Sequence, residues 1–155
     1  MAKERHKIVP ASYLVLMKEN KVLLGRRFNT GYEDGKCSLP AGHVDKNENF
    51  TQCIIREAKE EIGIDLKLED LRVAHIMQRD SHEKENGDRV DVFFTAQKWE
   101  GDIVNKESHK CDDLSWHDLD NLPENIIPYV QYALNCIKNN VFYSEYGWKQ
   151  NYDDN

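Results

Sequence analysis

The segment from residue 50 to residue 62 constrains this chain most, because it combines helical periodicity with an unusual grouping of charge. Its apolar residues recur at i, i+1, i+4 and i+8, the spacing of one helix face: Ile54, Ile55, Ala58 and Ile62. Gly63 follows in the place of a C-terminal cap, and either Asn47 or Asn49 precedes as an N-terminal cap. We therefore predict a helix over 50–62 whose apolar stripe packs against a sheet.

Three glutamates of this predicted helix stand at i, i+3 and i+4, namely Glu57, Glu60 and Glu61. Side chains at this spacing share one face, with Cβ atoms about 5–6 Å apart. Three carboxylates so close repel one another, and the helix dipole disfavours them in the C-terminal half. A hard divalent cation offsets that repulsion, and Mg²⁺ bound by carboxylates keeps positions for water and phosphate oxygens. A solvated acidic face is the alternative that this triplet alone leaves open.

The neighbouring residues extend the triplet to a motif over residues 42–64. Its fixed positions are Gly42, Glu48, Arg56, Glu57, Ala58, Glu60, Glu61, Gly63 and Ile64. This segment resembles the Nudix box, G-x5-E-x7-R-E-U-x-E-E-x-G-U, where U is a bulky aliphatic residue and Ala58 is the small end of that class. The run L-P-A-G at 39–42 and the region 114–123 also resemble the MutT-type Nudix hydrolase family, so the resemblance covers most of the chain.

The resemblance implies an α/β fold, an α/β/α sandwich with a mixed β-sheet. It implies that Glu57, Glu60 and Glu61 bind the metal, with the backbone carbonyl of Ala41 completing the ligand set. Arg56 and Glu48 are implied to form a buried pair that orients the loop and the helix. Gly42, which borders the substrate, and Gly63 are expected to need unusual backbone freedom.

By the same resemblance the chain is a Mg²⁺-dependent hydrolase, with Mn²⁺ as a substitute, that cleaves a diphosphate linkage. A water oriented by the metal attacks one phosphorus in line and a carboxylate accepts its proton, without a covalent intermediate. The general base is either a glutamate of the box or a carboxylate on a later loop. That loop offers Glu107, Asp112 and Asp113, of which we rank Glu107 first.

Two arginines and several aromatic residues are candidates for contacts with substrate. Arg26 and Arg27 follow a predicted strand at a point where related enzymes often place a basic residue on the phosphates, and a plain surface charge is the alternative. Tyr32, Phe28 and Trp99 are candidates for stacking on a base, with core packing at least as plausible for Trp99. The histidines His75, His82 and His109 show no metal-ligand spacing and stay unassigned.

The compact single domain is similar to MutT-type nucleoside triphosphate diphosphatases, and this resemblance implies a nucleoside triphosphate, in ordinary or oxidised form, that would yield the monophosphate and pyrophosphate. Hydrolysis of ADP-ribose or nucleotide-sugar substrates is one alternative. A nucleotide-binding sensor that has lost turnover is another, although sensors usually lose these glutamates. An interaction scaffold whose acidic helix serves only solubility is the third. The box specifies diphosphate chemistry and says little about the attached group.

Composition excludes several other classes. The net charge of −7 argues against binding of nucleic acid through bulk electrostatics. No apolar run is long enough to span a membrane, and the polar first nine residues are not a signal peptide. The four cysteines, Cys37, Cys53, Cys111 and Cys136, lack zinc spacing and are expected to be reduced, buried thiols. We expect a cytoplasmic protein, with a homodimer left open.

The remaining elements read as a single domain over residues 1–155 with strands before and after the box helix. Strands are expected at 8–17, 22–24, 71–79, 89–99 and 114–116, with a short stub at 38–42. Polar loops are expected at 25–36, 80–88 and 101–112. A last helix begins near Pro128 and, with an aromatic tail, occupies about 126–152. The tail carries Phe142, Tyr143, Tyr146 and Trp148, so we expect it to dock on the domain.

Overall fold

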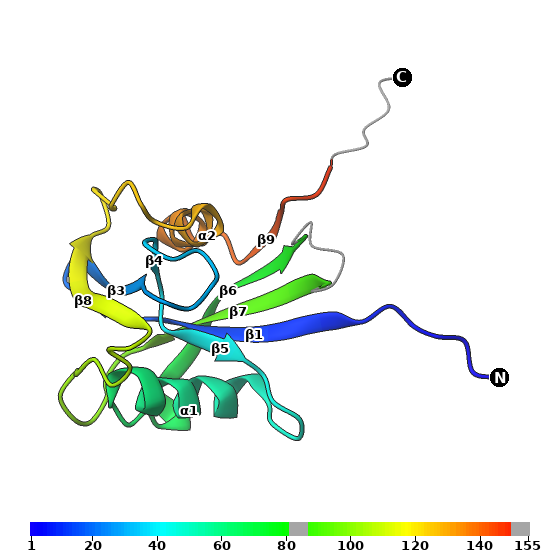
Figure 1. Cartoon of the computed structure of the whole chain (residues 1–155), viewed down its shortest axis with the longest axis horizontal. Coiled ribbons are helices and arrows are strands. Elements are labelled where there is room, and N and C mark those ends of the chain that lie inside the picture. The colour runs from blue at the N-terminus through cyan, green and yellow to red at the C-terminus, as the bar shows by residue number, and fades with distance from the viewer. Residues whose placement is uncertain (81–86, 150–155) are drawn as a thin grey trace.

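The computed structural model describes residues 1–80 and 87–149, which form a mixed β-sheet structure between two helices (Figure 1). The helices are α1 (Phe50–Ile62) and α2 (Pro128–Lys138), and a short 3₁₀ turn, η1, spans Leu68–Asp70. The strands are β1 (Ile8–Val15), β2 (Met17–Lys18), β3 (Lys21–Arg27), β4 (Cys37–Ser38), β5 (Ala41–His43), β6 (Leu71–Arg79), β7 (Asp88–Ala96), β8 (Cys111–Asp118) and β9 (Tyr143–Tyr146).

The strands form two sheets that lie between α1 and α2. The larger has the order β5-β1-β7-β6-β9, and the smaller joins β2, β3, β4 and β8, with β8 pairing β3. In the larger sheet β1 runs parallel to β7 and antiparallel to β5, while β6 is antiparallel to β7 and parallel to β9. The predicted α/β/α sandwich with a mixed sheet is confirmed.

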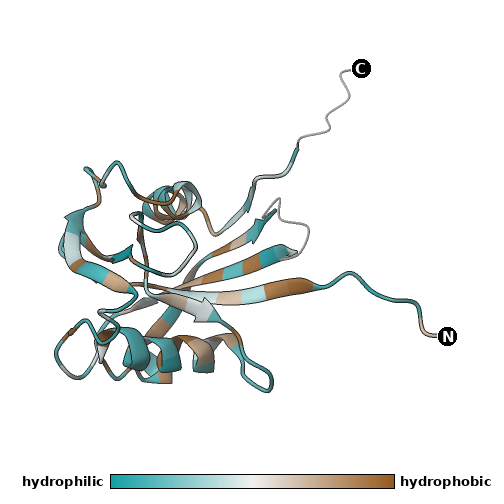
Figure 2. Ribbon diagram, in the orientation of Figure 1, coloured by the Kyte–Doolittle hydropathy of each residue, from teal (hydrophilic) through white to brown (hydrophobic). Residues whose placement is uncertain are grey.

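Alternation along the strands supplies one apolar face to each helix, as the banding of the strands in Figure 2 illustrates. On β1, Ala11, Tyr13 and Val15 belong to the core beneath α2, whereas Leu14 belongs to the core beneath α1. On β3, Val22 and Leu24 likewise belong to the core beneath α2, whereas Leu23 belongs to the core beneath α1. Because both faces of these central strands are covered, both faces are apolar.

The boundaries of α1 agree with the predicted helix at both ends. Asn49 caps it: its side chain accepts from the Gln52 N–H at 2.8 Å, and the Gln52 side chain accepts from the Asn49 N–H at 3.0 Å. Gly63 ends the helix in the left-handed region, with φ of 75°. The predicted stripe is confirmed, since Ile54, Ala58 and Ile62 are buried and Ile55 packs against the same core.

Several predicted boundaries were wrong by a few residues. The loop expected at 25–36 begins only after Arg27, because Gly25–Arg27 pair with β8 inside β3. Cys111 and Asp112, placed in a loop, belong to β8 for the same reason, and the strand expected to 99 ends at Ala96. The stub at 38–42 is divided into β4 and β5 around Pro40, which has no N–H to pair. For the loop expected at 80–88, residues 81–86 lie outside the described residues.

The C-terminal region docks as expected through β9, which extends the larger sheet beside β6. His75, left unassigned above, is fully buried here, with its two ring nitrogens contacting the Val141 carbonyl and the Ser144 hydroxyl, each at 2.7 Å. Trp148 donates its indole N–H to the Gln78 carbonyl at 3.1 Å. Residues 150–152 of the predicted tail lie outside the described residues. In the described part of the chain, no helix is both long and apolar enough to cross a membrane.

Candidate active site

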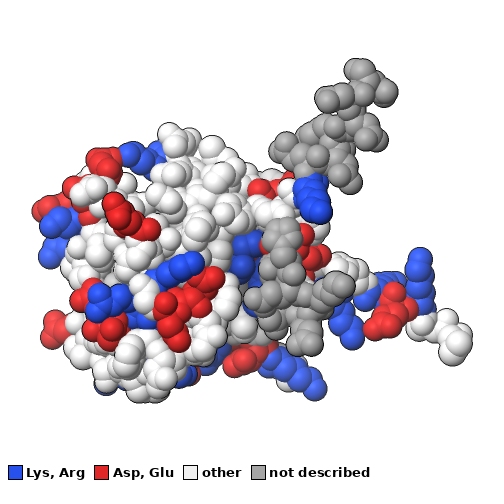
Figure 3. All heavy atoms as spheres, turned by 45° about the horizontal axis from the view of Figure 1, so that its top comes forward, with Lys and Arg blue, Asp and Glu red and all other residues white. Residues whose placement is uncertain are grey.

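A cleft of about 560 Å³ opens between the C-terminal half of α1 and the strands β3, β5 and β8. We call it the glutamate cleft; its charged lining residues are Glu57, Glu60, Glu61, Glu107, Arg26, Arg27 and Lys110. Figure 3 shows acidic and basic side chains lying close together on this side of the molecule. The three glutamates predicted from helical spacing therefore border one cavity rather than open solvent.

The loop before α1 approaches the helix closely enough to fix two of these glutamates. A Cβ atom added to Gly42 would lie 1.9 Å from Oε1 of Glu57, so only glycine leaves room for that carboxylate. The Ala41 N–H donates to Oε2 of Glu61 at 3.0 Å. Gly42 does not have a positive φ, so the expectation of unusual backbone freedom was wrong there, and its requirement is space beside Glu57. For Gly63, the positive φ confirms that expectation.

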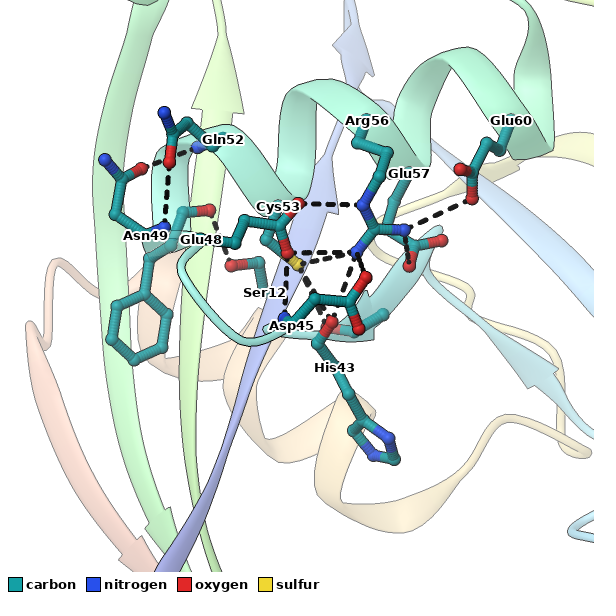
Figure 4. A network of polar contacts seen from close by, with 12 residues as sticks. Ser12, His43, Asp45, Glu48, Asn49, Gln52, Cys53, Arg56, Glu57 and Glu60 are labelled. Atoms are coloured by element: carbon teal, nitrogen blue, oxygen red, sulfur yellow. Dashed lines mark hydrogen bonds and ion pairs between the residues drawn. The ribbon is translucent and has the colours of Figure 1, made fainter.

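Arg56 lies at the centre of the polar network shown in Figure 4. Its guanidinium donates to both carboxylate oxygens of Glu48, at 2.7 and 3.1 Å. It also donates to Glu57 at 2.7 Å and to Glu60 at 3.2 Å. The side chain of Arg56 is 30% exposed and that of Glu48 13% exposed, so the pair is less buried than predicted. Arg56 therefore holds two of the clustered glutamates as well as its partner Glu48.

The protein environment moves the pKa values of these carboxyls in opposite directions. The Arg56 hydrogen bonds lower the pKa of Glu48 to about 2, so this carboxylate is ionised across the physiological range. Burial raises the pKa of Glu57, although Arg56 opposes the shift. Burial, followed by the charge of Glu57, raises the pKa of Glu61 well above its usual range. Desolvation and like charges thus penalise the ionised forms of Glu57 and Glu61.

This arrangement suits a hard divalent cation. Two crowded carboxylates whose charge is opposed by burial are stabilised when a cation joins them, and oxygen is the ligand atom that Mg²⁺ prefers. Gly42 leaves space for the Glu57 carboxylate, and the Ala41 N–H holds the Glu61 carboxylate beside it. Within residues 1–80 and 87–149, no three acidic, histidine or cysteine side chains already converge on one point. Arg56 contacts both Glu57 and Glu60 and holds these two carboxylates at the cleft.

The three loop carboxylates proposed as a general base occupy different environments. Glu107 lines the glutamate cleft, and its charge contributes to the raised pKa values of Glu57 and Glu61. Asp112 instead accepts from Nε of Arg26 at 2.7 Å, and Asp113 accepts from the Ser115 hydroxyl at 2.8 Å. Of the three, only Glu107 faces the clustered glutamates.

The two candidate arginines also differ. Arg26 is partly neutralised by its contact with Asp112. Arg27 donates to the Tyr32 carbonyl at 2.7 Å and to the Thr30 hydroxyl at 3.1 Å, and its guanidinium lies 5.3 Å from the centre of the Tyr32 ring. Arg27 is thereby held over the cleft by its own loop. Tyr32 does not line the glutamate cleft but borders a second cavity beside it.

Comparison with known proteins agrees with this geometry. The family model described as NUDIX domain matches residues 7–135. The chain belongs to the NUDIX domain family. Its fold is also similar to the crystal structure of a MutT NUDIX hydrolase from Burkholderia pseudomallei, with a TM-score of 0.75 and 23% identity over 84% of this chain and 98% of that one. The resemblance drawn from the box and its flanking runs is confirmed.

Curated relatives differ in the reaction named for them. The NAD-capped RNA hydrolase NudC of Pseudomonas aeruginosa is 28% identical over 76% of this chain and 38% of its own length. The ADP-ribose pyrophosphatase of Methanocaldococcus jannaschii is 30% identical over 71% of this chain and 62% of its own length. The 8-oxo-dGTP diphosphatase of Proteus vulgaris is 24% identical over 67% of this chain and 88% of its own length. The chain spans less than two thirds of the length of each of the first two relatives.

A second cavity combines four residues that the sequence analysis named as site candidates with five that it missed, which are Tyr13, His43, Arg79, Arg89 and Tyr129. This cavity, of about 350 Å³, is called the arginine chamber here; its lining residues are Tyr13, Arg27, Tyr32, Ala41, Gly42, His43, Arg79, Arg89 and Tyr129. It shares Arg27, Ala41 and His43 with the glutamate cleft. The two cavities are therefore adjacent, and the residues that they share lie on β3 and β5 rather than on α1. The available signal was a charged residue, Asp91, inside a strand whose neighbours are apolar on both faces.

Proposed function

We propose that this NUDIX domain hydrolyses a diphosphate linkage in a nucleoside diphosphate-X substrate with the help of Mg²⁺. The observation that carries the proposal is the convergence of Glu57, Glu60, Glu61 and Arg27 on one cleft. The carboxylates are placed for a divalent cation, and the arginine for the phosphate oxygens that accompany it.

Each residue then has a distinct task. Glu57, Glu60 and Glu61 hold the metal, with the carbonyl of Ala41 as a further ligand, and Arg56 with Glu48 orients this set. When bound, Mg²⁺ supplies neutralisation of the diphosphate oxygens and favours ionisation of a nearby water. Arg27 holds a phosphate oxygen from the opposite side of the cleft. Mn²⁺, which accepts the same oxygen ligands, would substitute.

Glu107 is the general base of the proposed reaction. Its carboxylate accepts a proton from the attacking water as the oxygen bonds to phosphorus and the bridging P–O bond breaks. The electron pair of that bond leaves with the released phosphate, so no side chain becomes covalently modified. Support for Glu107 comes from its position in the cleft and from the engagement of Asp112 and Asp113 elsewhere.

For the substrate we favour a nucleoside triphosphate, in ordinary or oxidised form, cleaved to the monophosphate and pyrophosphate. The chain spans 88% of the relative named 8-oxo-dGTP diphosphatase, a closer match in length than the other relatives described above. ADP-ribose is the second candidate, because the relative named ADP-ribose pyrophosphatase has the higher identity.

The test measures the pyrophosphate and the nucleoside monophosphate released from a panel of substrates, with Mg²⁺ and with EDTA. The panel contains common and oxidised nucleoside triphosphates, ADP-ribose, a dinucleoside polyphosphate and nucleotide sugars. We expect Mg²⁺-dependent pyrophosphate release from a triphosphate that Glu60→Gln abolishes. Release that persists in Glu60→Gln would contradict the metal assignment, and release of AMP from ADP-ribose alone would contradict the favoured substrate.

A further inference from the structure

The arginine chamber is a basic cavity on an acidic protein. Arg27, Arg79 and Arg89 line it, and no carboxylate is among the described lining residues. The chain as a whole carries a net charge of −7. A local excess of guanidinium groups in a concave site attracts anions and excludes other ligands. The chamber shares Arg27, Ala41 and His43 with the glutamate cleft, so one ligand can extend across both cavities.

Arg79 is built rigidly into the wall of the chamber. Arg79 is 7% exposed, and its Nε donates to the carboxylate of the fully buried Asp91 at 2.9 Å. The guanidinium carbon lies 3.7 Å from the centre of the Tyr129 ring, so one face of the guanidinium is covered. The hydroxyl groups of Tyr129 and Tyr13 are 3.0 Å apart, which fixes the ring in turn. Arg79 is therefore fixed and pre-oriented in the wall of the chamber, with its charge partly balanced by Asp91.

Arg89 contacts His43 at the edge of the chamber. A terminal nitrogen of Arg89 contacts Nε2 of His43 at 2.6 Å. An arginine only donates hydrogen bonds, so Nε2 must accept, and the imidazole is neutral with its proton on Nδ1. The buried Nε of Arg89 has no hydrogen-bond partner among the described residues.

We propose that the arginine chamber binds a phosphoryl group that the substrate carries outside the linkage being cleaved. Such a group would accept charge-assisted hydrogen bonds from the guanidinium groups of Arg89 and Arg79, both of which line the chamber. Two substrate features supply this chemistry: the γ-phosphate of a triphosphate chain, or a phosphate ester on a ribose. This inference rests on the proposed diphosphate hydrolysis, because it concerns the same substrate.

The test compares ligand pairs that differ by one phosphate, using the full-length protein. The first pair is dGTP and dGDP, which probes the γ-phosphate; the second is NADPH and NADH, and the third coenzyme A and dephospho-coenzyme A, which probe ribose phosphates. Affinities are measured calorimetrically in EDTA, and kcat/KM is measured with Mg²⁺. The variants are Arg89→Gln, which removes the charge, Arg89→Lys, which keeps it, and Arg72→Gln as a charge-matched control.

In at least one pair we expect the wild-type protein to favour the phosphorylated member by about 10- to 100-fold, as expected for one or two charge-assisted contacts. Arg89→Gln should remove most of that preference, Arg89→Lys should retain part of it, and Arg72→Gln should retain all of it. The control is apt because Arg72 lies at the opposite end of β6 and contacts backbone carbonyls of Glu69 and Leu71.

The outcomes separate this inference from the proposed hydrolysis. Hydrolysis that depends on Glu60 without a preference in any pair, or an equal effect of Arg89→Gln on both members, would overturn the chamber assignment. A preference in binding that Arg89→Gln removes, in the absence of turnover on every substrate, would support the chamber and overturn the hydrolase.

Discussion

Three of the four acidic side chains that line the glutamate cleft come from one helix, whereas the arginines of the arginine chamber come from three strands. In the cleft, sequence spacing alone brings Glu57, Glu60 and Glu61 together, and they repel one another. In the chamber, Arg79 meets Asp91 only because β6 and β7 pair in register. The like charges of the cleft thus oppose folding and serve the proposed chemistry. The ion pair beside the chamber instead stabilises the sheet.

The sharpest test of the comparison is to remove one charge from the cleft. Glu60→Gln and Glu61→Gln should each lower kcat by roughly two to four orders of magnitude, through loss of a ligand that acts in the transition state. Each should leave the free energy of unfolding within about 1 kcal/mol of wild type, because the change also relieves like-charge repulsion. Steady-state kinetics and urea unfolding measure the two effects.

The matched control for these variants is Glu69→Gln, which changes an exposed glutamate of η1 that does not line the cleft. It should leave both measurements unchanged. Wild-type turnover in both cleft variants would remove the basis for the metal assignment.

Removal of the charge of Arg79 from the chamber should lower the stability of the fold more than removal of a cleft glutamate does. Arg79→Ala leaves the fully buried Asp91 without its partner, which should cost about 3–5 kcal/mol of unfolding free energy. Exchanging both residues, in Arg79→Leu with Asp91→Leu, should recover much of this loss because no buried charge remains. Urea unfolding curves of the single and double variants measure the difference. Equal stability of Arg79→Ala and wild type would show that the pair does not hold the sheet together.

The same contrast explains how much of the molecule could be predicted from sequence. The helix, its caps and its glutamate face depend on neighbours within four residues; periodicity predicted the helix bounds and the Gly63 cap, and it left the N-cap between Asn47 and Asn49. The role of His75 and the meeting of Arg79 with Asp91 depend on which strands pair. No local pattern specifies that β6 lies between β7 and β9, so these contacts could not be predicted.

For the loop before the helix, the family resemblance predicted site residues that helical spacing alone did not. It gave the wrong physical reason for one of them. Gly42 was expected to need backbone freedom, but it needs room for Glu57, since the carboxylate occupies the place of a Cβ. A sequence motif preserves the residue type without stating the contact that requires it. The oriented side chain is visible only once the loop is placed against α1.

This contact gives a third, smaller effect. Gly42→Ala should displace the Glu57 carboxylate and lower kcat/KM by about a hundredfold, as expected for misplacement of a reacting group by about 1 Å. The stability loss should be only about 1 kcal/mol, because a flexible side chain moves aside. In the double variant Gly42→Ala with Glu57→Ala, stability should return while activity stays low. A stability that does not recover would indicate that the backbone, not Glu57, limits the space.

The smallest effect concerns the acid stability that Arg56 gives to the cleft. Glu48 has a pKa of about 2 in the folded protein, below its usual value of 4.5, chiefly because Arg56 donates to it. Its ionised form therefore stabilises the fold fully above pH 4.5, and this contribution is lost as the pH falls toward 2. Arg56→Ala should lower stability at pH 7 and flatten the decline between those limits, and it should lower activity by releasing Glu57. Unfolding curves at pH 7, 5 and 3.5 for wild type, Arg56→Ala and the exposed control Arg72→Ala test this, and parallel pH profiles would contradict it.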